Sequence, residues 1–187
     1  MMTELYDIWQ WEKGEIPNEI CDYIISNIDS TSFEKGSVNK DPVVDISERN
    51  VNIQFSTTNW INALLCGYIR YANHANFHYD LSDWDKEALQ ISKYSKGEFY
   101  KMHMDFGPDI HMTRKLSITV QLSDENDYEG GDLIFYNHPD EKQRVTSVRG
   151  KGSIIVFDSR VHHEVTPVTK GVRYSLVKWY HGDEPLK

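Results

Sequence analysis

The chain has 187 residues, a length that suits one domain with a sizeable hydrophobic core. Its hydrophobic fraction of 39% and its five Trp, eleven Tyr and seven Phe exclude a disordered chain. Its formal net charge of −9 argues against unassisted binding to nucleic acid or to an anionic membrane, and we expect neither as a partner.

The N-terminus and the cysteines favour a cytoplasmic protein. The first residues lack the basic region and apolar run of a signal peptide, and no stretch approaches the ~18 consecutive apolar residues of a membrane span. Cys21 and Cys66 lie among apolar residues, which predicts buried free thiols in a reducing compartment. We expect a cytoplasmic chain and favour a monomer.

In chain order, the first expected elements are two helices separated by a polar loop and a strand. Residues 17–29 show the apolar spacing of a helix that begins near Pro17. Residues 30–50 are polar, and their part 35–50 is long enough to close over a substrate as a lid, the alternative being a disordered surface loop. Residues 51–55 alternate as in a strand, and residues 60–72 present the apolar face of a second helix.

After about residue 76, short strand-like runs separated by turn residues continue to the end of the chain. They cover residues 88–94, 99–104, 115–122, 132–136, 153–158 and 171–179. Helices followed by many short strands predict a β-sandwich or jelly roll supported by N-terminal helices. We expect one domain over residues 1–187, with helical support and a lid loop in 1–87 and the motif-bearing strands in 88–182.

His103 and Asp105 form the first candidate metal-binding pair. Residues two apart on a strand point to the same face, so the imidazole and the carboxylate would project into one cavity. A third ligand from another strand would complete a two-His-one-carboxylate iron site. The C-terminal segment supplies two adjacent candidates, His162 and His163, and the residues alone do not choose between them.

Arg173 is a candidate anion-binding residue on the last expected strand. Arg173, Ser175 and Trp179 share one face of that strand. An arginine that faces a jelly-roll interior is costly unless an anion meets it, and its fork matches a carboxylate. The alternative is a structural ion pair with an Asp or Glu of the chain.

Three motifs occur together in this half of the chain. They are Tyr94-x5-Tyr100-x2-His103-x-Asp105, Tyr128-Glu-Gly-Gly131-Asp-Leu133, and His163-Glu-Val-Thr-Pro-Val-Thr-x-Gly-x-Arg173-Tyr-Ser175. In order and spacing they resemble the iron(II)- and 2-oxoglutarate-dependent oxygenases of the prolyl 4-hydroxylase superfamily. The chain looks most like the PKHD-type hydroxylases of bacteria and phages. The resemblance covers roughly residues 88–182.

The resemblance implies a mainly β fold, in which N-terminal helices pack against a double-stranded β-helix, or jelly roll. It implies that His103, Asp105 and His163 hold Fe(II) as the catalytic centre. Arg173 would bind the distal carboxylate of the co-substrate 2-oxoglutarate, beside Tyr94 and Ser175. O2 is the second co-substrate, and ascorbate is expected to stimulate the reaction.

Two further features follow from this resemblance. The pair Gly130-Gly131 would form the turn into a core strand. Gln121 stands where many members of the family carry an aromatic residue, so the lining of the co-substrate pocket departs from theirs here.

Three residues are candidates for shaping a substrate pocket. They are Tyr100, Trp179 and Arg49, and the alternative for the two aromatic residues is a place in the core. On a regular strand Tyr100 would face away from His103, so a pocket position requires a twist or bulge between them.

The resemblance implies hydroxylation of a prolyl residue in a peptide or protein with an accessible proline, with release of succinate and CO2. One alternative is the same chemistry on a free amino acid, a small metabolite or a nucleobase. An alternative of another class is a non-catalytic jelly-roll module that binds metal.

Overall fold

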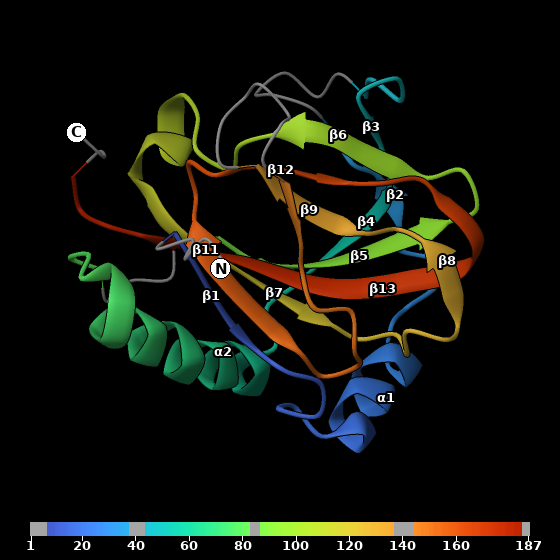
Figure 1. The fold of residues 1–187 in the computed structure, drawn as a ribbon, viewed down its shortest axis with the longest axis horizontal. Coiled ribbons are helices and arrows are strands. Elements are labelled where there is room, and N and C mark those ends of the chain that lie inside the picture. The colour runs from blue at the N-terminus through green and yellow to red at the C-terminus, as the bar shows by residue number, and fades with distance from the viewer. Residues whose placement is uncertain (1–6, 38–43, 83–86, 137–143, 185–187) are drawn as a thin grey trace.

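The computed structural model describes residues 7–37, 44–82, 87–136 and 144–184 (Figure 1). The expected lid over 35–50 is therefore described only at its two ends, because residues 38–43 lie outside these ranges. Among the described residues no helix has the length and apolar character needed to cross a bilayer.

The described strands form two antiparallel sheets. The large sheet has the order β1-β11-β7-β13-β5-β4-β2, with β8 paired to β13. Its strands are β1 (Ile8–Trp11), β2 (Glu34–Lys35), β4 (Asn52–Ser56), β5 (Leu89–Ser95), β7 (Arg114–Gln121), β8 (Tyr128–Gly130), β11 (Ile154–Asp158) and β13 (Val168–His181). The small sheet has the order β10-β9-β12-β6-β3. Its strands are β3 (Arg49–Asn50), β6 (Phe99–His103), β9 (Leu133–Tyr136), β10 (Arg144–Thr146) and β12 (His162–Val165).

The mainly β prediction is confirmed, and two facing antiparallel sheets fit a jelly roll. Each strand expected between residues 88 and 179 is present within a few residues of its predicted bounds. The polar segment 30–50 is not wholly a loop, because its ends form β2 and β3 at sheet edges. These strands have two residues each, too few for an alternating pattern to show.

Two helices precede the strands that carry the motifs, α1 (Asn18–Ser26) and α2 (Asn59–Ala72), and a short π-helix (Asn73–Phe77) follows α2. The first helix ends three residues earlier than predicted, where the Asn27 side chain donates a hydrogen bond to the Tyr23 carbonyl at 2.7 Å. That bond supplies one of the unpaired carbonyls of the last turn with a donor.

Alternation along β7 gives the large sheet two different faces. Leu116, Ile118 and Val120 belong to a hydrophobic cluster that also contains Ile24 of α1 and Leu65 of α2. Figure 1 shows both helices on the side of the large sheet away from the small one. The intervening β7 side chains are polar and buried, and they face the space between the sheets, where the predicted site residues lie.

The prediction of two buried cysteines is correct for Cys21 and wrong for Cys66. Cys21 lies on the side of α1 that packs into the hydrophobic cluster, and burial raises the pKa of its thiol to about 11. Cys66 on α2 is only half-buried, because its side of the helix faces away from the cluster.

Candidate metal centre

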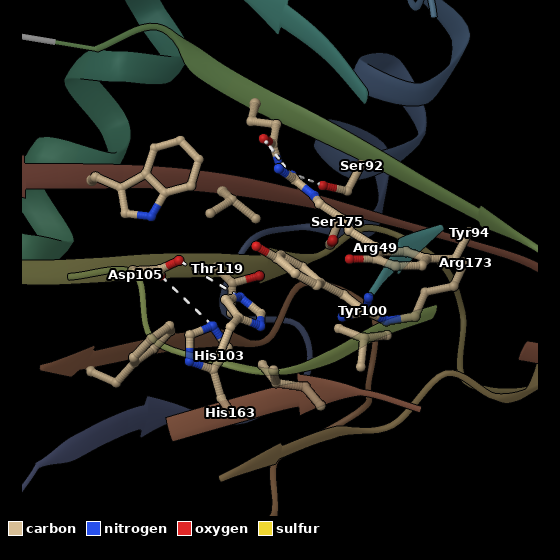
Figure 2. Close-up of a pocket in the computed structure, with 16 residues that line it drawn as sticks. Arg49, Ser92, Tyr94, Tyr100, His103, Asp105, Thr119, His163, Arg173 and Ser175 are labelled. Atoms are coloured by element: carbon tan, nitrogen blue, oxygen red, sulfur yellow. Dashed lines mark hydrogen bonds and ion pairs between the residues drawn. The ribbon is translucent and has the colours of Figure 1, made fainter. Parts of the chain in front are cut away.

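The three predicted metal ligands meet between the two sheets. His103 is the last residue of β6, Asp105 lies in the bend that follows, and His163 lies on β12 directly opposite His103. One ligand atom of each residue lies within 4.8 Å of the others (Figure 2). The expectation that Asp105 continues the strand is wrong, because β6 ends two residues earlier, yet its carboxylate still reaches the same cavity.

A bulge in β6 brings Tyr100 to this site. Tyr100 pairs with Val165 and His103 with His163. The paired residues are three positions apart on β6 and two positions apart on β12, so β6 contains one extra residue. The extra residue reverses the side to which Tyr100 points. Its ring stacks on the His103 imidazole with centroids 3.5 Å apart. The bulge that a pocket position required is therefore present.

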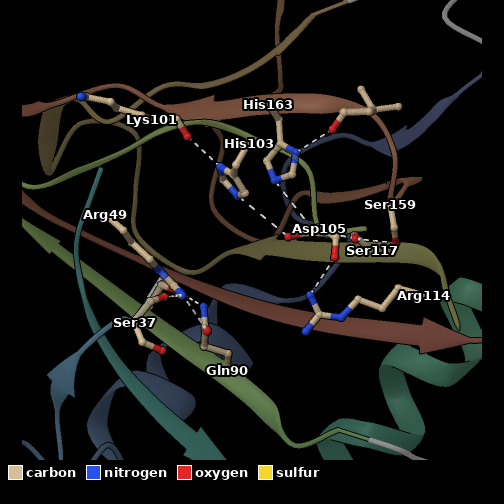
Figure 3. Close-up of polar contacts among 12 residues, drawn as sticks. Ser37, Arg49, Gln90, Lys101, His103, Asp105, Arg114, Ser117, Ser159 and His163 are labelled. Atoms are coloured by element: carbon tan, nitrogen blue, oxygen red, sulfur yellow. Dashed lines mark hydrogen bonds and ion pairs between the residues drawn. The ribbon is translucent and has the colours of Figure 1, made fainter. Parts of the chain in front are cut away.

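Backbone carbonyls orient both imidazoles. His103 Nδ1 lies 2.7 Å from the Lys101 carbonyl oxygen, and His163 Nδ1 lies 2.9 Å from that of Val161 (Figure 3). With Nδ1–H as the donor, each Nε2 keeps a free lone pair. These Nε2 atoms lie 3.9 and 3.8 Å from the two carboxylate oxygens of Asp105, so all three lone-pair donors point to one space.

The protonation states suit metal binding. Burial lowers the pKa of His103 to about 3, which keeps its imidazole neutral at physiological pH. Burial opposes ionisation of Asp105. The neighbouring imidazoles of His163 and His103, the Arg114 guanidinium and a hydrogen bond from Ser117 outweigh it and lower the Asp105 pKa to about 2. The donor set of two imidazoles and one carboxylate fits Fe(II).

A buried ionic network supports the carboxylate from behind. Arg114 donates to the Asp105 backbone carbonyl at 2.9 Å (Figure 3). It also donates to both carboxylate oxygens of Glu87, at 2.9 and 2.5 Å. Its guanidinium lies 4.0 Å from the ring centroid of Trp179. His181 Nε2 lies 3.1 Å from the Glu87 carboxylate. One arginine thereby fixes both the Asp105 loop and the Trp179 ring.

The triad opens into a cavity whose space not filled by atoms, open solvent included, is about 470 Å³. Arg173, Ser175 and Trp179 of β13 and Tyr94 of β5 line it, as does Arg49, so every residue predicted for the co-substrate or substrate pocket lies here. Among the lining residues that sequence reasoning missed, Gln90, Ser92 and Thr119 are polar and buried.

Arg173 is a buried cation held by a neutral partner. Its side chain is 2% exposed, and the Gln121 amide oxygen accepts from its Nε at 3.1 Å and from its Nη2 at 2.7 Å. In the described part of the chain no carboxylate pairs with Arg173, so the alternative of a structural ion pair is not what the structure shows. A Cβ at Gly131, whose φ is +63°, would lie 3.2 Å from Arg173 Cδ, so a glycine here leaves room for the arginine stem.

The sequence matches a known family over this region. A family profile described as "2OG-Fe(II) oxygenase superfamily" matches residues 89–181. A PKHD-type hydroxylase of Idiomarina loihiensis is 35% identical over 91 residues, which cover 49% of this chain and 40% of that protein. The match thus spans less than half the length of this curated relative.

Two solved structures share the fold. A Pseudomonas putida prolyl-4-hydroxylase superposes with a TM-score of 0.74 at 19% identity, over 95% of this chain and 94% of that one. A Trichoplax adhaerens prolyl hydroxylase, solved with a peptide fragment of the hypoxia inducible factor oxygen degradation domain, gives 0.73 at 18% identity, over 96% and 85%. At these identities the two structures show the fold alone. The profile match, the PKHD-type relative and the clustered His103, Asp105 and His163 show that the chain belongs to the 2OG-Fe(II) oxygenase superfamily.

Proposed function

We propose that this chain is an Fe(II)- and 2-oxoglutarate-dependent dioxygenase that hydroxylates a prolyl residue of a peptide or protein and releases succinate and CO2. The observation that carries the proposal is one cavity that joins a two-His-one-carboxylate set to a buried arginine without an acidic partner. The proposal takes residues 1–187 as one oxygenase domain in which residues 1–87 support the strands.

His103, Asp105 and His163 would hold the iron through two Nε2 atoms and one carboxylate oxygen. Bound Fe(II) supplies the O2-dependent oxidation of 2-oxoglutarate that is coupled to hydroxylation of a C–H bond. The chain holds the ligand atoms in place before metal arrives, because carbonyl groups orient both imidazoles and Ser117 donates to Asp105 Oδ2 at 2.7 Å.

Arg173 would bind the distal carboxylate of 2-oxoglutarate. The Tyr94 ring lies 5.4 Å from the Arg173 guanidinium carbon, and Ser175 is 2% exposed on the same cavity wall. Within the described residues, no protein group pairs with the hydroxyls of Tyr94, Thr119 or Ser175. These hydroxyls are therefore available to hydrogen-bond a ligand in the cavity.

The prolyl substrate is supported by the fold shared with two prolyl hydroxylases, one solved with a peptide. The aromatic rings of Tyr100 and Trp179 on the cavity wall suit an apolar pyrrolidine ring. A proline with its fixed φ loses less conformational entropy on binding than other residues do.

The test is incubation of the protein with Fe(II), ascorbate, 2-oxoglutarate and a panel of proline-containing peptides, followed by mass spectrometry and a succinate assay. We expect succinate release and the gain of one oxygen atom on a proline. His163→Ala serves as the inactive control. Oxygen gain on another residue type, or only on free amino acids or nucleobases, would overturn the prolyl assignment. Metal binding without any succinate would favour the non-catalytic module.

A further inference from the structure

The cavity contains two guanidinium groups, and the co-substrate accounts for one of them. Arg173 lies at the buried end beside Gln121, and Arg49 enters from β3 on the small sheet (Figure 2). Asp105 is the one acidic side chain among the described residues that line the cavity. An arginine that faces such a space without an acidic partner is ready to bind an anion.

Arg49 is fixed in place by neutral groups. Its Nη1 donates to the Ser37 carbonyl at 2.7 Å and its Nη2 to the Gln90 amide oxygen at 3.1 Å (Figure 3). Gly36 packs so closely that a Cβ there would lie 2.7 Å from Arg49 Nε. The described residues offer Arg49 no carboxylate partner. The guanidinium is thus oriented without being neutralised, as Gln121 orients Arg173.

The charges of the loaded site leave Arg49 without a counter-ion. Fe(II) contributes two positive charges, and Arg173 and Arg49 contribute one each. Asp105 and the two carboxylates of 2-oxoglutarate contribute three negative charges. One positive charge remains, and we assign it to Arg49, because the co-substrate is bound by Arg173. An uncompensated charge in a partly buried site costs free energy unless the remaining ligand is anionic.

We infer that the substrate to be hydroxylated carries a carboxylate that binds Arg49, an inference that rests on the proposed function. The Arg49 guanidinium carbon lies 4.7 Å from the Tyr100 ring centroid, which lies 3.5 Å from that of His103. These two distances place the guanidinium within about 8 Å of the His103 ring. One extended residue spans roughly 3.5 Å, so the carboxylate belongs to the target residue or to one within two positions of it.

Two kinds of substrate present such a carboxylate. One is an Asp or Glu side chain next to the target proline in a peptide, and the other is the α-carboxylate of a C-terminal or free proline. Peptide pairs that differ in one charge separate the two. The first pair has Pro-Asp or Pro-Asn in an otherwise neutral, blocked peptide. The second pair ends in proline as the free acid or as the amide, with L-proline and L-prolinamide as its single-residue version.

The experiment measures succinate release and oxygen incorporation for each pair. It also measures the dissociation constant by calorimetry under nitrogen with 2-oxoglutarate present, where no turnover occurs. We expect the acidic member of at least one pair to bind and react at least about tenfold better than its neutral partner. In Arg49→Gln this preference should fall below about threefold, and Arg49→Lys should keep part of it. Arg70→Gln, the same change on the exposed face of α2, should keep the wild-type preference.

Three results would overturn the inference. They are equal use of acidic and neutral peptides, no binding of any acidic probe, and an Arg49→Gln variant whose affinity for the co-substrate falls while its charge preference stays unchanged. A complete lack of 2-oxoglutarate turnover by the wild-type protein would overturn the proposed function itself. The wild-type comparison of paired peptides needs no variant, so a folding defect cannot mimic the result.

Discussion

Gln121→Glu tests the idea that the co-substrate arginine must stay charged and unpaired. The substitution keeps the size and shape of the side chain and changes only its charge. The Gln121 amide oxygen already lies 3.1 and 2.7 Å from two nitrogens of Arg173, and both residues are 2% exposed. A carboxylate at this place would form a buried ion pair with Arg173 and cancel the positive charge that 2-oxoglutarate needs.

The expected loss of affinity follows from this geometry. Two unit charges about 4 Å apart interact by roughly 4 kcal/mol at the effective dielectric constant of about 20 that suits protein sites. Desolvation of the new carboxylate offsets part of that energy. A net loss of about 3 kcal/mol weakens 2-oxoglutarate binding by on the order of 100-fold.

Calorimetric titration of 2-oxoglutarate into the Mn(II)-loaded protein measures the effect without turnover. Gln121→Met, of similar length and without charge, should weaken binding much less, because Arg173 keeps its charge. The thermal unfolding temperature of Gln121→Glu should not fall greatly, since the new carboxylate has a partner. A dissociation constant within threefold of the wild-type value would refute the reasoning.

The remaining predictions concern the metal, the arginine and the ionic network. His163→Ala should abolish Fe(II) binding and succinate release while His162→Ala retains both, measured by metal titration and succinate assay; the reverse result would reassign the ligand. Arg173→Ala should lose roughly 2–5 kcal/mol of 2-oxoglutarate affinity, and Arg173→Lys should recover only part of it, because an ammonium group cannot replace the two-pronged guanidinium. An Arg173→Lys variant that binds 2-oxoglutarate as tightly as the wild type would contradict this. Burial opposes ionisation of Glu87, but hydrogen bonds from His181 and Arg114 outweigh it and lower its pKa to about 2 from 4.5. Its stabilising effect, up to about 3 kcal/mol, is therefore complete above pH 4.5 and lost as the pH falls toward 2. The free energy of unfolding, measured with urea, should therefore fall less between pH 4.5 and pH 2 in Glu87→Gln than in the wild type.

The strands and the metal-binding pattern could be predicted because both leave local signals. Alternation fixes which side of β13 faces the cavity, and the predicted set of Arg173, Ser175 and Trp179 does line it. The ligand pattern is equally local, since His103 and Asp105 are two residues apart. Such features depend on neighbours in the sequence, where periodicity is informative.

Other parts of the site depend on contacts that local patterns do not encode. The β6 bulge that turns Tyr100 inward exists only relative to β12, so the residues of β6 alone predict the opposite direction. Thr119 and Gln90 are ordinary polar residues on buried strands, and only the assembled cavity shows that they line it. A two-residue strand such as β3 is held by pairing with β6, and its own sequence shows no strand pattern.

The direct pairing of His103 with His163 also has a consequence for how the protein folds. The two residues are 60 positions apart (163 − 103 = 60), and β6 and β12 are neighbours in the small sheet. Closing so long a loop costs chain entropy before the contacts that stabilise it can form, so the pairing of β6 with β12 should form late in folding. Iron can bind with full affinity only after that step, and once bound it would cross-link the two strands. Metal loading should therefore slow unfolding more than it speeds folding.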